Sequence, residues 1–303
     1  MDVSIIIVNY NTKNLTKDCI NSIYEQTAGL EFEIIVSDNN SKDGSIEMIK
    51  ESFPNVILIE NNENLGFGRA NNKGLAVATG KYIFYLNSDT ILLNNAVKIF
   101  FDYFEKHNNE NIGALGCNLQ NKDGETIHSF GQIVPLKKRV KTLFHTFLGI
   151  SKDTIKYFLT HKKESIKIEH HQNFTTGEVP YITGADLFVK NNDFAKYDER
   201  YFMYNEEVDL QLQMHKANQK SILIEGPKII HLEGGSTEKK LYKIFYLSSI
   251  GNQQLFLSYV QFYNKNEHKP FLLILLKLAI FLIWVNPYLI KNTKKNIPRL
   301  LKS

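Results

Sequence analysis

Four short apolar runs in the first third of the chain alternate with segments in which apolar residues recur at helical spacing. The apolar runs lack polar alternation and are rich in β-branched residues, which is typical of strands buried on both faces. They lie at residues 3–8, 33–37, 56–60 and 82–86. The helical patterns lie at residues 15–23, 43–53 and 67–78, the last with Gly80 as an end signal. This order predicts an α/β fold with a doubly wound, mostly parallel sheet.

The remaining two thirds of the chain give a mixed pattern. Further helical patterns lie at residues 94–107 and 206–217, with Asn205 as a candidate N-cap, and through most of the sequence from 241 onward. Short apolar runs lie at residues 112–117, 179–189, 221–225 and 229–230, and residues 121–124 predict a hairpin turn. A helical C-terminal part is therefore expected to follow the α/β part.

Polar side chains follow each of the first four predicted strands. They lie at residues 9–12, 38–41, 61–64 and 87–90. In doubly wound sheets ligands bind beyond the carboxyl ends of the strands, so these residues predict a binding edge. The alternative is that Asn, Asp and Ser only cap helices and form turns. Four such strand ends in succession favour the binding edge.

Candidate metal ligands occur at two places in the chain. Asp89 ends a buried strand among the oxygen-bearing side chains of Asn87 and Ser88, a setting that suits a hard divalent cation such as Mg²⁺ or Mn²⁺. His231 opens a polar run after the last short strand. On spacing alone His231 is either a second ligand or an ordinary loop histidine.

Three carboxylates lie in the first turn of the helix predicted from residue 206. Glu206, Glu207 and Asp209 either stabilise the positive end of the helix dipole or supply a general base directed into the cleft.

These motifs, taken in order, resemble the family 2 glycosyltransferases of the GT-A fold, in particular the rhamnosyltransferase-like branch that builds bacterial surface polysaccharides. The resemblance extends from residue 3 to about residue 263. The matching motifs are residues 7–11, 37–44, 64–74, 86–90, 183–185, 202–210 and 231–236. The resemblance implies a Rossmann-like, mixed and mostly parallel sheet flanked by helices, with a helical C-terminal tail. It also implies a nucleotide-sugar donor and a glycan or lipid-linked acceptor.

The resemblance assigns the donor site to the strand ends. Asp38 matches the carboxylate that binds the N3–H of a uracil or thymine ring, Asn9 lines the same pocket, and the loop 64–72 closes over base and ribose. Gly66 lets the backbone approach the ligand, and Arg69 either faces the pyrophosphate or lies on the surface. The other residues implied in donor binding are Asn40, Asn64, Phe67, Asn72, Asn87 and Ser88.

The resemblance also assigns the metal and the chemistry. Asn87, Ser88 and Asp89 occupy the family's Asp-x-Asp position with Asn in place of the first Asp, so Asp89 is the chief metal carboxylate, and His231 completes the Mn²⁺ or Mg²⁺ site. Glu207 matches the proposed base, where Asp is usual, and Asp209 and Glu206 are the alternatives.

For the acceptor, the resemblance assigns the segment of Thr183, Gly184 and Asp186 to the acceptor side of the cleft. Direct attack of an acceptor hydroxyl, with no covalent intermediate, implies inversion at the sugar.

Composition and the distribution of charge limit the class of protein and suggest how the chain is divided. The 43% hydrophobic and 22% charged residues exclude a disordered or fibrous chain, and two cysteines exclude a disulfide framework. The net charge of +4 divides into −7 for residues 1–136, +6 for 137–169, −2 for 170–263 and +7 for 264–303. Together with the resemblance, this division implies a catalytic domain over residues 1–263 with a nucleotide-sugar half (1–136), a basic excursion (137–169) and an acceptor half (170–263), followed by a tail (264–303).

The tail carries an apolar run at residues 271–284 with lysines on both sides, too short to span a bilayer and better suited to lie at its surface. No basic leader precedes the first strand. The sequence thus predicts a cytoplasmic protein held on the inner face of the cytoplasmic membrane, where anionic lipids attract basic segments. A helix packed on the catalytic body, or a homodimer interface, is the alternative.

Three other functions remain to be separated from glycosyl transfer. A nucleotidyltransferase usually has a glycine-rich phosphate loop after the first strand, which residues 9–12 lack. A non-catalytic nucleotide-sugar-binding or membrane scaffold protein would not need Asp89, His231 and the acidic pair. A nucleic-acid binder would account for the basic stretches but not for the polar strand ends, so no nucleic-acid partner is expected.

Overall fold

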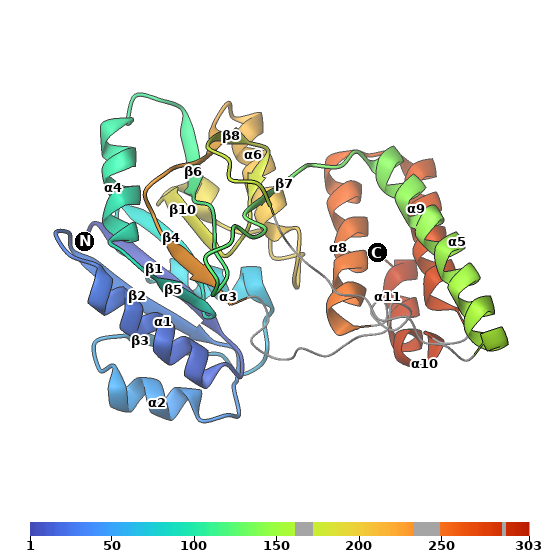
Figure 1. The fold of residues 1–303 in the computed structure, drawn as a ribbon, viewed down its shortest axis with the longest axis horizontal. Helices are drawn as coiled ribbons and strands as arrows, with labels where there is room; N and C mark the ends of the chain where they lie inside the picture. Colours follow the sequence, from blue (N-terminus) through green and yellow to red (C-terminus); the bar gives the residue numbers. More distant parts are fainter. Residues whose placement is uncertain (161–171, 233–248, 287–288, 303) are drawn as a thin grey trace. The chain divides into compact units, whose positions relative to one another are not determined.

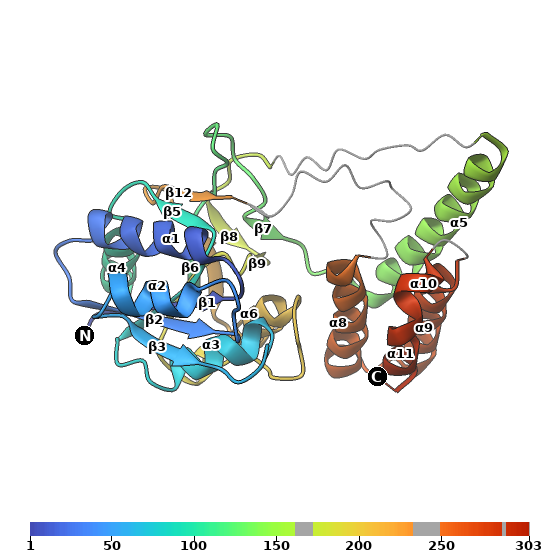
Figure 2. The same cartoon turned by 90° about the horizontal axis from the view of Figure 1, so that it is seen from below.

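The computed structural model describes residues 1–160, 172–232, 249–286 and 289–302. The chain divides into two compact units. Unit 1 comprises residues 1–133, 170–199 and 206–237, and unit 2 comprises residues 134–169, 200–205 and 238–303. Figures 1 and 2 show the elements of each unit.

Unit 1 is built on an eight-stranded mixed sheet. Its order is β3 (Ile57–Glu60), β2 (Phe32–Asp38), β1 (Val3–Asn9), β4 (Tyr82–Asn87), β10 (Asp186–Lys190), β6 (Ile112–Gly116), β11 (Lys220–Leu223) and β8 (Gly177–Val179). The first four strands are parallel, β6 and β11 are parallel, and β10 and β8 are antiparallel to their neighbours. The α/β fold with a mostly parallel sheet is thereby confirmed.

The strands form because their side chains are buried alternately on the two faces of the sheet. On β1, for example, Ile5 and Ile7 join one apolar core and Ile6 joins the other. The first core is covered by α1 (Lys13–Gln26), α2 (Ser45–Ser52) and α4 (Ala96–Lys106). The second is covered by α3 (Phe67–Leu75), α6 (Glu206–Lys216) and the short 3-10 helix η1 (Asp193–Ala195). Both helical layers can be followed in Figure 1.

Two small antiparallel pairs complete the described part of unit 1. Strand β5 (Thr90–Leu92) follows β4 directly and pairs with β12 (Ile229–His231). Strand β7 (Phe130–Gly131) pairs with β9 (Tyr181–Ile182). The predicted turn at 121–124 is present, since the N–H of Gly124 donates to the carbonyl of Asn121 at 3.1 Å.

Two local expectations differ from the structure. Helix α3 ends at Leu75 rather than at residue 78, and Gly80 does not cap it. The N–H of Gly80 donates instead to Ser4 Oγ, and a Cβ there would lie 2.4 Å from the Ser4 nitrogen. The apolar run 179–189 contributes to the three strands β8, β9 and β10, which are separated at Pro180 and at residues 183–185.

Unit 2 is helical in its described part. It contains α5 (Leu136–Thr160), α8 (Ile250–Asn266), α9 (Pro270–Trp284), α10 (Ile290–Thr293), the 3-10 helix η2 (Lys294–Asn296) and α11 (Ile297–Lys302). Helix α9 packs against α5, α8 and α11, and α5 and α9 lie side by side in Figure 1. The basic stretch predicted at 137–169 begins as helix α5, while residues 161–169 lie outside the described part.

The contacts within unit 2 tie α5 to α8. The guanidinium of Arg139 lies 4.1 Å from the centre of the Tyr259 ring, a cation–π contact. The Tyr263 hydroxyl donates to the carbonyl of Val134, and Glu267 accepts from the N–H of Leu136 at 2.8 Å. Among the described residues, no helix combines the length and the apolar character that crossing a membrane requires.

Candidate active site

Asn9 connects the carboxyl ends of strands β1 and β2. Its Nδ2 donates to Asp38 Oδ2 at 2.5 Å and to Ser41 Oγ at 3.0 Å. Its Oδ1 accepts from the hydroxyls of Thr12 and Thr16 at 2.6 and 2.7 Å. The N–H of Ser41 donates to Asp38 Oδ1 at 2.8 Å. Asn9 and Asp38 are fully buried, so this network fixes the backbone of the strand-end edge.

Asn39 holds the loop that leads into α3. Its Nδ2 donates to the carbonyl of Gly66 at 3.0 Å, and its Oδ1 accepts from the N–H of Leu65 at 3.3 Å. Gly66 has a φ of 83°, which favours glycine, and its N–H donates to Asn64 Oδ1. Asn40 donates to a carbonyl of the same loop at 3.0 Å. The loop expected to cover the donor is therefore tied to the end of β2 by amide side chains.

Asp89 and His231 are brought together by the pairing of β5 with β12. In that pairing Thr90 lies opposite His231. The His231 Nε2 lies 3.2 Å from Asp89 Oδ1, and the N–H of Leu232 donates to the carbonyl of Asp89 at 2.9 Å. The His231 and Asp89 side chains are 14% and 19% exposed, so both are largely buried but still reach solvent. The rest of this predicted motif, residues 233–236, lies outside the described residues.

Asn87 and Ser88 link the Asp89–His231 pair to the carboxyl end of β1. The Asn87 Nδ2 lies 3.4 Å from the His231 Nε2, and the Ser88 hydroxyl lies 3.1 Å from that of Thr12. Since Thr12 also donates to Asn9, the ends of β1 and β4 form one continuous polar edge. Residues from three separate motifs, namely Asn9, the Asn87–Ser88 pair and His231, therefore share this edge.

The segment at residues 183–185 joins the polar edge to the start of helix α6. The N–H of Asn87 donates to the carbonyl of Ala185 at 3.0 Å. A Cβ on the neighbouring Gly184 would lie 3.4 Å from the Phe67 ring and 3.8 Å from the Glu207 Cβ. Phe67, Gly184 and Glu207 are therefore direct neighbours, although they come from three distant parts of the sequence.

The carboxylates at the start of α6 lie in different surroundings. Burial raises the pKa of Glu207 to about 7, although the residue keeps part of its surface exposed. Asp209 is 1% exposed and lies 3.5 Å from the Gln213 amide, and Glu206 is 3% exposed. Of the three, Glu207 combines contact with solvent and a pKa suited to accepting a proton near neutral pH.

Gly68 permits close contact between α3 and α6. A Cβ at this position would lie 3.2 Å from the Tyr197 Cβ and 3.6 Å from the Glu206 Cβ. The Tyr197 ring packs edge-on against Phe67, with ring centres 6.0 Å apart. The start of α3, next to the loop expected to cover the donor, therefore packs directly against the start of α6, which carries the acidic residues.

Gln211 is a positioning residue that the sequence patterns did not reveal. It is fully buried in α6, and its side chain bonds both backbone groups of Ile182 at 2.8 Å. Its Nε2 also donates to the carbonyl of Glu207 at 3.1 Å. The sequence around Gln211 carries no pattern that points to Ile182 as its partner.

The acceptor residues expected from the sequence do not all reach the surface. The N–H of Thr183 donates to the carbonyl of Ser129 at 3.0 Å. Asp186 is fully buried in β10, opposite Leu86 of β4, and its Oδ2 accepts from the N–H of Cys117 at 2.8 Å. Burial raises the pKa of Asp186 to about 7. The structure places Asp186 inside the sheet, with its side chain fully buried.

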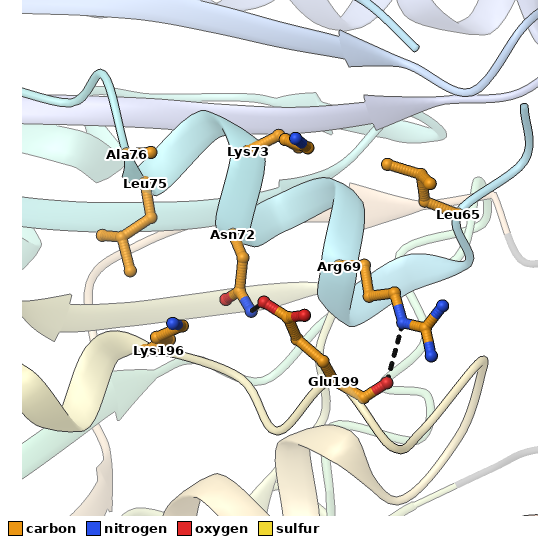
Figure 3. A pocket seen from close by; sticks show the side chains of 8 residues that line it. All are labelled: Leu65, Arg69, Asn72, Lys73, Leu75, Ala76, Lys196 and Glu199. Atoms are coloured by element: carbon orange, nitrogen blue, oxygen red, sulfur yellow. Dashed lines mark hydrogen bonds between the residues drawn. The ribbon is translucent and has the colours of Figure 1, made fainter. Parts of the chain in front are cut away.

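Arg69 and Asn72 lie along α3 and face the segment that follows η1. Asn72 exchanges two hydrogen bonds of 2.9 Å with the backbone of Tyr197, and Arg69 Nε donates to the carbonyl of Glu199 at 2.8 Å. Figure 3 shows these side chains around a cavity of about 500 Å³. It is lined by Leu65, Arg69, Asn72, Lys73, Leu75, Ala76, Lys196 and Glu199. Arg69 thus lies on an exposed helix face.

The sequence also matches a known family. The profile described as "Glycosyl transferase family 2" covers residues 4–166, which include most of the polar edge. The chain belongs to this family. It is therefore an enzyme of the glycosyltransferase class, as the motifs predicted.

Several curated glycosyltransferases are similar to this family 2 chain. The N-acetylglucosaminyl-diphospho-decaprenol L-rhamnosyltransferase of Mycobacterium tuberculosis is 25% identical over 218 residues, which cover 67% of each chain. The minor teichoic acid biosynthesis protein GgaB of Bacillus subtilis is 33% identical over 229 residues, or 72% of this chain and 24% of GgaB. The branch expected from the motifs is therefore represented among these relatives.

Solved structures support the GT-A fold. The mannosyltransferase PcManGT from Pyrobaculum calidifontis, in complex with GDP-Man and Mn²⁺, has a TM-score of 0.55 at 15% identity and covers 99% of this chain and 75% of its own. S. aureus TarS 1-349 in complex with UDP-GlcNAc has a TM-score of 0.51 at 14% identity, covering 100% and 79%. At these identities the likeness concerns the fold alone.

The candidate metal-binding side chains of this family 2 glycosyltransferase suit a divalent cation that is also coordinated by a bound ligand. No group of three or more His, Cys, Asp or Glu side chains suited to a metal occurs in the described ranges. Asp89 and His231 together offer one carboxylate and one imidazole, 3.2 Å apart. Mg²⁺ and similar ions often take only one or two carboxylates from the protein and the rest from water and substrate phosphates. The pair suits a cation that binds with a diphosphate.

Proposed function

We propose that this chain is an inverting, divalent-cation-dependent glycosyltransferase that uses a dTDP- or UDP-sugar. The segment at residues 183–185 carries the proposal, because it lies between the candidate metal pair and the candidate base. The carbonyl of Ala185 accepts from the N–H of Asn87 at 3.0 Å, Asn87 lies beside His231, and a Cβ on Gly184 would lie 3.8 Å from the Glu207 Cβ. A sugar donor and an acceptor hydroxyl would meet in this region.

Different side chains of this protein would perform different parts of the reaction. Asp89 and His231 would hold Mn²⁺ or Mg²⁺, which as a Lewis acid stabilises the charge on a departing nucleoside diphosphate. Asn9, Asp38 and the loop at 64–66 would position the nucleoside. Glu207 would remove the proton of the acceptor hydroxyl as it attacks the anomeric carbon, so the configuration at that carbon would invert.

The names of two relatives suggest candidates for the donor sugar and the acceptor. A rhamnosyl donor and a lipid-linked glycan acceptor are suggested by the name of the mycobacterial relative. The GgaB name instead suggests a wall polymer such as a teichoic acid. A hexose or N-acetylhexosamine donor remains the alternative to rhamnose, and the synthesis of a bacterial surface polysaccharide accommodates both acceptors.

The exposed surface of helix α9 supports an acceptor that is bound to a membrane, because it suits attachment of the protein to that membrane. Phe271, Ile274 and Leu278 are 70%, 63% and 43% exposed and follow each other at helical spacing. The opposite side of α9 is buried within unit 2. The tail from residue 264 carries eight basic residues and one acidic residue. An apolar stripe within a basic segment is typical of attachment to an anionic membrane surface.

Donor binding and turnover with the purified full chain test this function. We expect one nucleoside class of sugar donors to raise the melting temperature, with a larger shift when Mn²⁺ or Mg²⁺ is added. Incubation of that donor with short glycan and lipid-linked acceptors should give a product of inverted anomeric configuration by NMR. Donor binding without transfer to any acceptor would favour a binding protein, and formation of a nucleotide sugar from a sugar phosphate would favour a nucleotidyltransferase.

A further inference from the structure

The cavity beside α3 has the features of a second anion-binding site. Arg69, Asn72, Lys73 and Ala76 lie three or four residues apart and so share one face of the helix. The segment from Lys196 to Glu199 forms the facing wall. Figure 3 shows Arg69 and Lys73 on the helix and Lys196 across from them.

The charges that line the cavity are mainly positive. Arg69, Lys73 and Lys196 supply three cations against the single carboxylate of Glu199. Glu199 Oε1 lies 3.4 Å from the Asn72 amide, and its main-chain carbonyl accepts from Arg69 Nε. That bond fixes the guanidinium plane, so the remaining N–H groups of Arg69 are oriented in advance for a ligand. The local excess of positive charge favours a phosphate over a neutral sugar.

The wall that supports these charges is rigid. Asn72 is 9% exposed and bonds both backbone groups of Tyr197, whose side chain is buried. Leu65 and Leu75 provide apolar surface between the charged groups. A cavity of about 500 Å³ falls within the size of ordinary small-ligand sites. A phosphate attached to a polyol or a sugar matches this combination of charged and apolar walls.

The cavity differs in composition from the proposed catalytic edge. Its lining contains none of Asn9, Asp38, Asp89, His231 and Glu207. The two regions are joined by α3, since Phe67 at the start of this helix lies beside Gly184, where an added Cβ would be 3.4 Å from the ring, and Arg69 follows two residues later. A ligand in the cavity would therefore lie along the same helix as the proposed reaction site without occupying it.

We propose that this cavity binds a phosphate group of the acceptor chain, outside the sugar unit that reacts. Arg69 and Lys73 are separated by one helical turn, about 6 Å along the axis, so they present two cations in a row to an extended anionic chain. Lys196 holds the same chain from the other wall. The identity of the ligand as an acceptor rests on the proposed function, whereas the anion site itself does not.

The test uses the full-length chain and a fluorescent glycerol-phosphate oligomer in an anisotropy titration. The double variant Lys73→Gln/Lys196→Gln should bind the oligomer roughly tenfold or more weakly, since hydrogen bonds to charged groups are the strong ones. Its affinity should also depend less on salt. The matched control, Lys17→Gln/Lys228→Gln, removes two exposed lysines elsewhere on unit 1 and should bind like the wild type.

Two further measurements separate the sources of the phosphate. Inorganic phosphate should compete only weakly if the site is built for a chain, and UDP should bind both double variants equally. Unchanged oligomer binding in Lys73→Gln/Lys196→Gln would overturn the proposal, and so would an equal loss of UDP binding, which would assign the cavity to the donor. Because no turnover is required, a failure here is distinguishable from a failure of glycosyl transfer.

Discussion

The side-chain amide of Gln211 bonds both the N–H and the carbonyl of Ile182, each at 2.8 Å. It thereby fastens helix α6, which carries Glu207, to the strand that leads into Gly184. Because Gln211 is fully buried, these two backbone groups have no access to water. The relation between the candidate base and the candidate acceptor segment thus depends on one neutral side chain.

We therefore expect Gln211→Leu to impair the use of the acceptor. The unpaired N–H and carbonyl would lower the free energy of unfolding by roughly 2–4 kcal/mol. The KM for the acceptor should rise and kcat should fall, while the Kd for the nucleotide sugar changes little. Steady-state kinetics and a donor titration check this.

A matched control for this prediction is Gln253→Leu in unit 2, where the side chain accepts from Asn296. It should also lower stability but leave the acceptor KM unchanged. Equal effects of both variants on that KM would show that Gln211 contributes only to stability.

Glu207 should impose a pH dependence on the reaction. Burial raises the pKa of this carboxyl to about 7, so the fraction able to accept a proton grows as the pH rises through 7. We expect kcat to increase over this range. Glu207→Gln should retain donor binding but lose roughly 10²–10⁴-fold in kcat and show no such increase. Full turnover in this variant would exclude Glu207 as the base and direct attention to Asp209.

The Glu207 carboxyl should also make the stability of the protein depend on pH. Stability should fall as the pH rises, whereas kcat should increase. The pKa of this carboxyl is higher in the folded state than in the unfolded state, so the folded state binds the proton more tightly. Its contribution to stability is then full below about pH 4.5 and is lost as the pH rises to about 7. Glu207→Gln should therefore melt at a higher temperature than the wild type at pH 8. The exposed Glu225→Gln provides the control and should leave the pH profile of melting unchanged.

The Asp89–His231 pair should determine the response to Mn²⁺. Asp89→Ala removes the only carboxylate of the pair, so stimulation by the cation should disappear. Asn87→Asp adds a carboxylate beside His231 and should strengthen Mn²⁺ binding in the presence of a nucleoside diphosphate. Mn²⁺ titrations followed by electron paramagnetic resonance measure both effects. The control is Asp123→Ala on the exposed turn, which should keep its stimulation by Mn²⁺. Undiminished stimulation by Mn²⁺ in Asp89→Ala would contradict a metal site at Asp89 and His231.

Attachment to membranes should depend on the exposed face of α9. The triple variant Phe271→Ser/Ile274→Ser/Leu278→Ser removes that apolar stripe without deleting the helix, which is packed within unit 2. We expect the wild type to float with vesicles that contain anionic lipid and the triple variant to remain largely unbound, because each large apolar side chain contributes about 1.5–3 kcal/mol. The control is Ile57→Ser/Val77→Ser/Leu93→Ser in unit 1. Equal flotation of the two triple variants would disprove attachment through α9.

The parallel half of the sheet was predictable because its signal is local. The apolar residues of β1, β2 and β4 are buried on both faces, and an unbroken apolar run reports this directly. The end of α3 was less predictable. Gly80 resembles a helix cap in sequence, but its role is set by Ser4 on a neighbouring strand. A residue whose constraint lies 76 positions away in the chain leaves no local pattern.

The candidate site was predictable in its residue types but not in its connections. Asn9, Asp38 and Asp89 follow strands, so the sheet alone places them at one edge. The pairing that puts Thr90 opposite His231 is long-range and is not encoded in the spacing of either segment. The burial of Asp186 was not predictable either, because it depends on the long-range register that pairs Asp186 with Leu86.

The Thr90–His231 pairing has a consequence for how the enzyme is made. A ribosome releases the chain from its N-terminus, so β1, β2 and β4 can form a sheet long before β12 is synthesised. The nucleoside edge would then exist in the nascent chain while Asp89 still lacks its histidine. Contacts of such long sequence separation also form late in folding, because they carry the largest loop-closure cost. The Asp89–His231 pair would thus be completed only after nearly the whole of unit 1 has been synthesised.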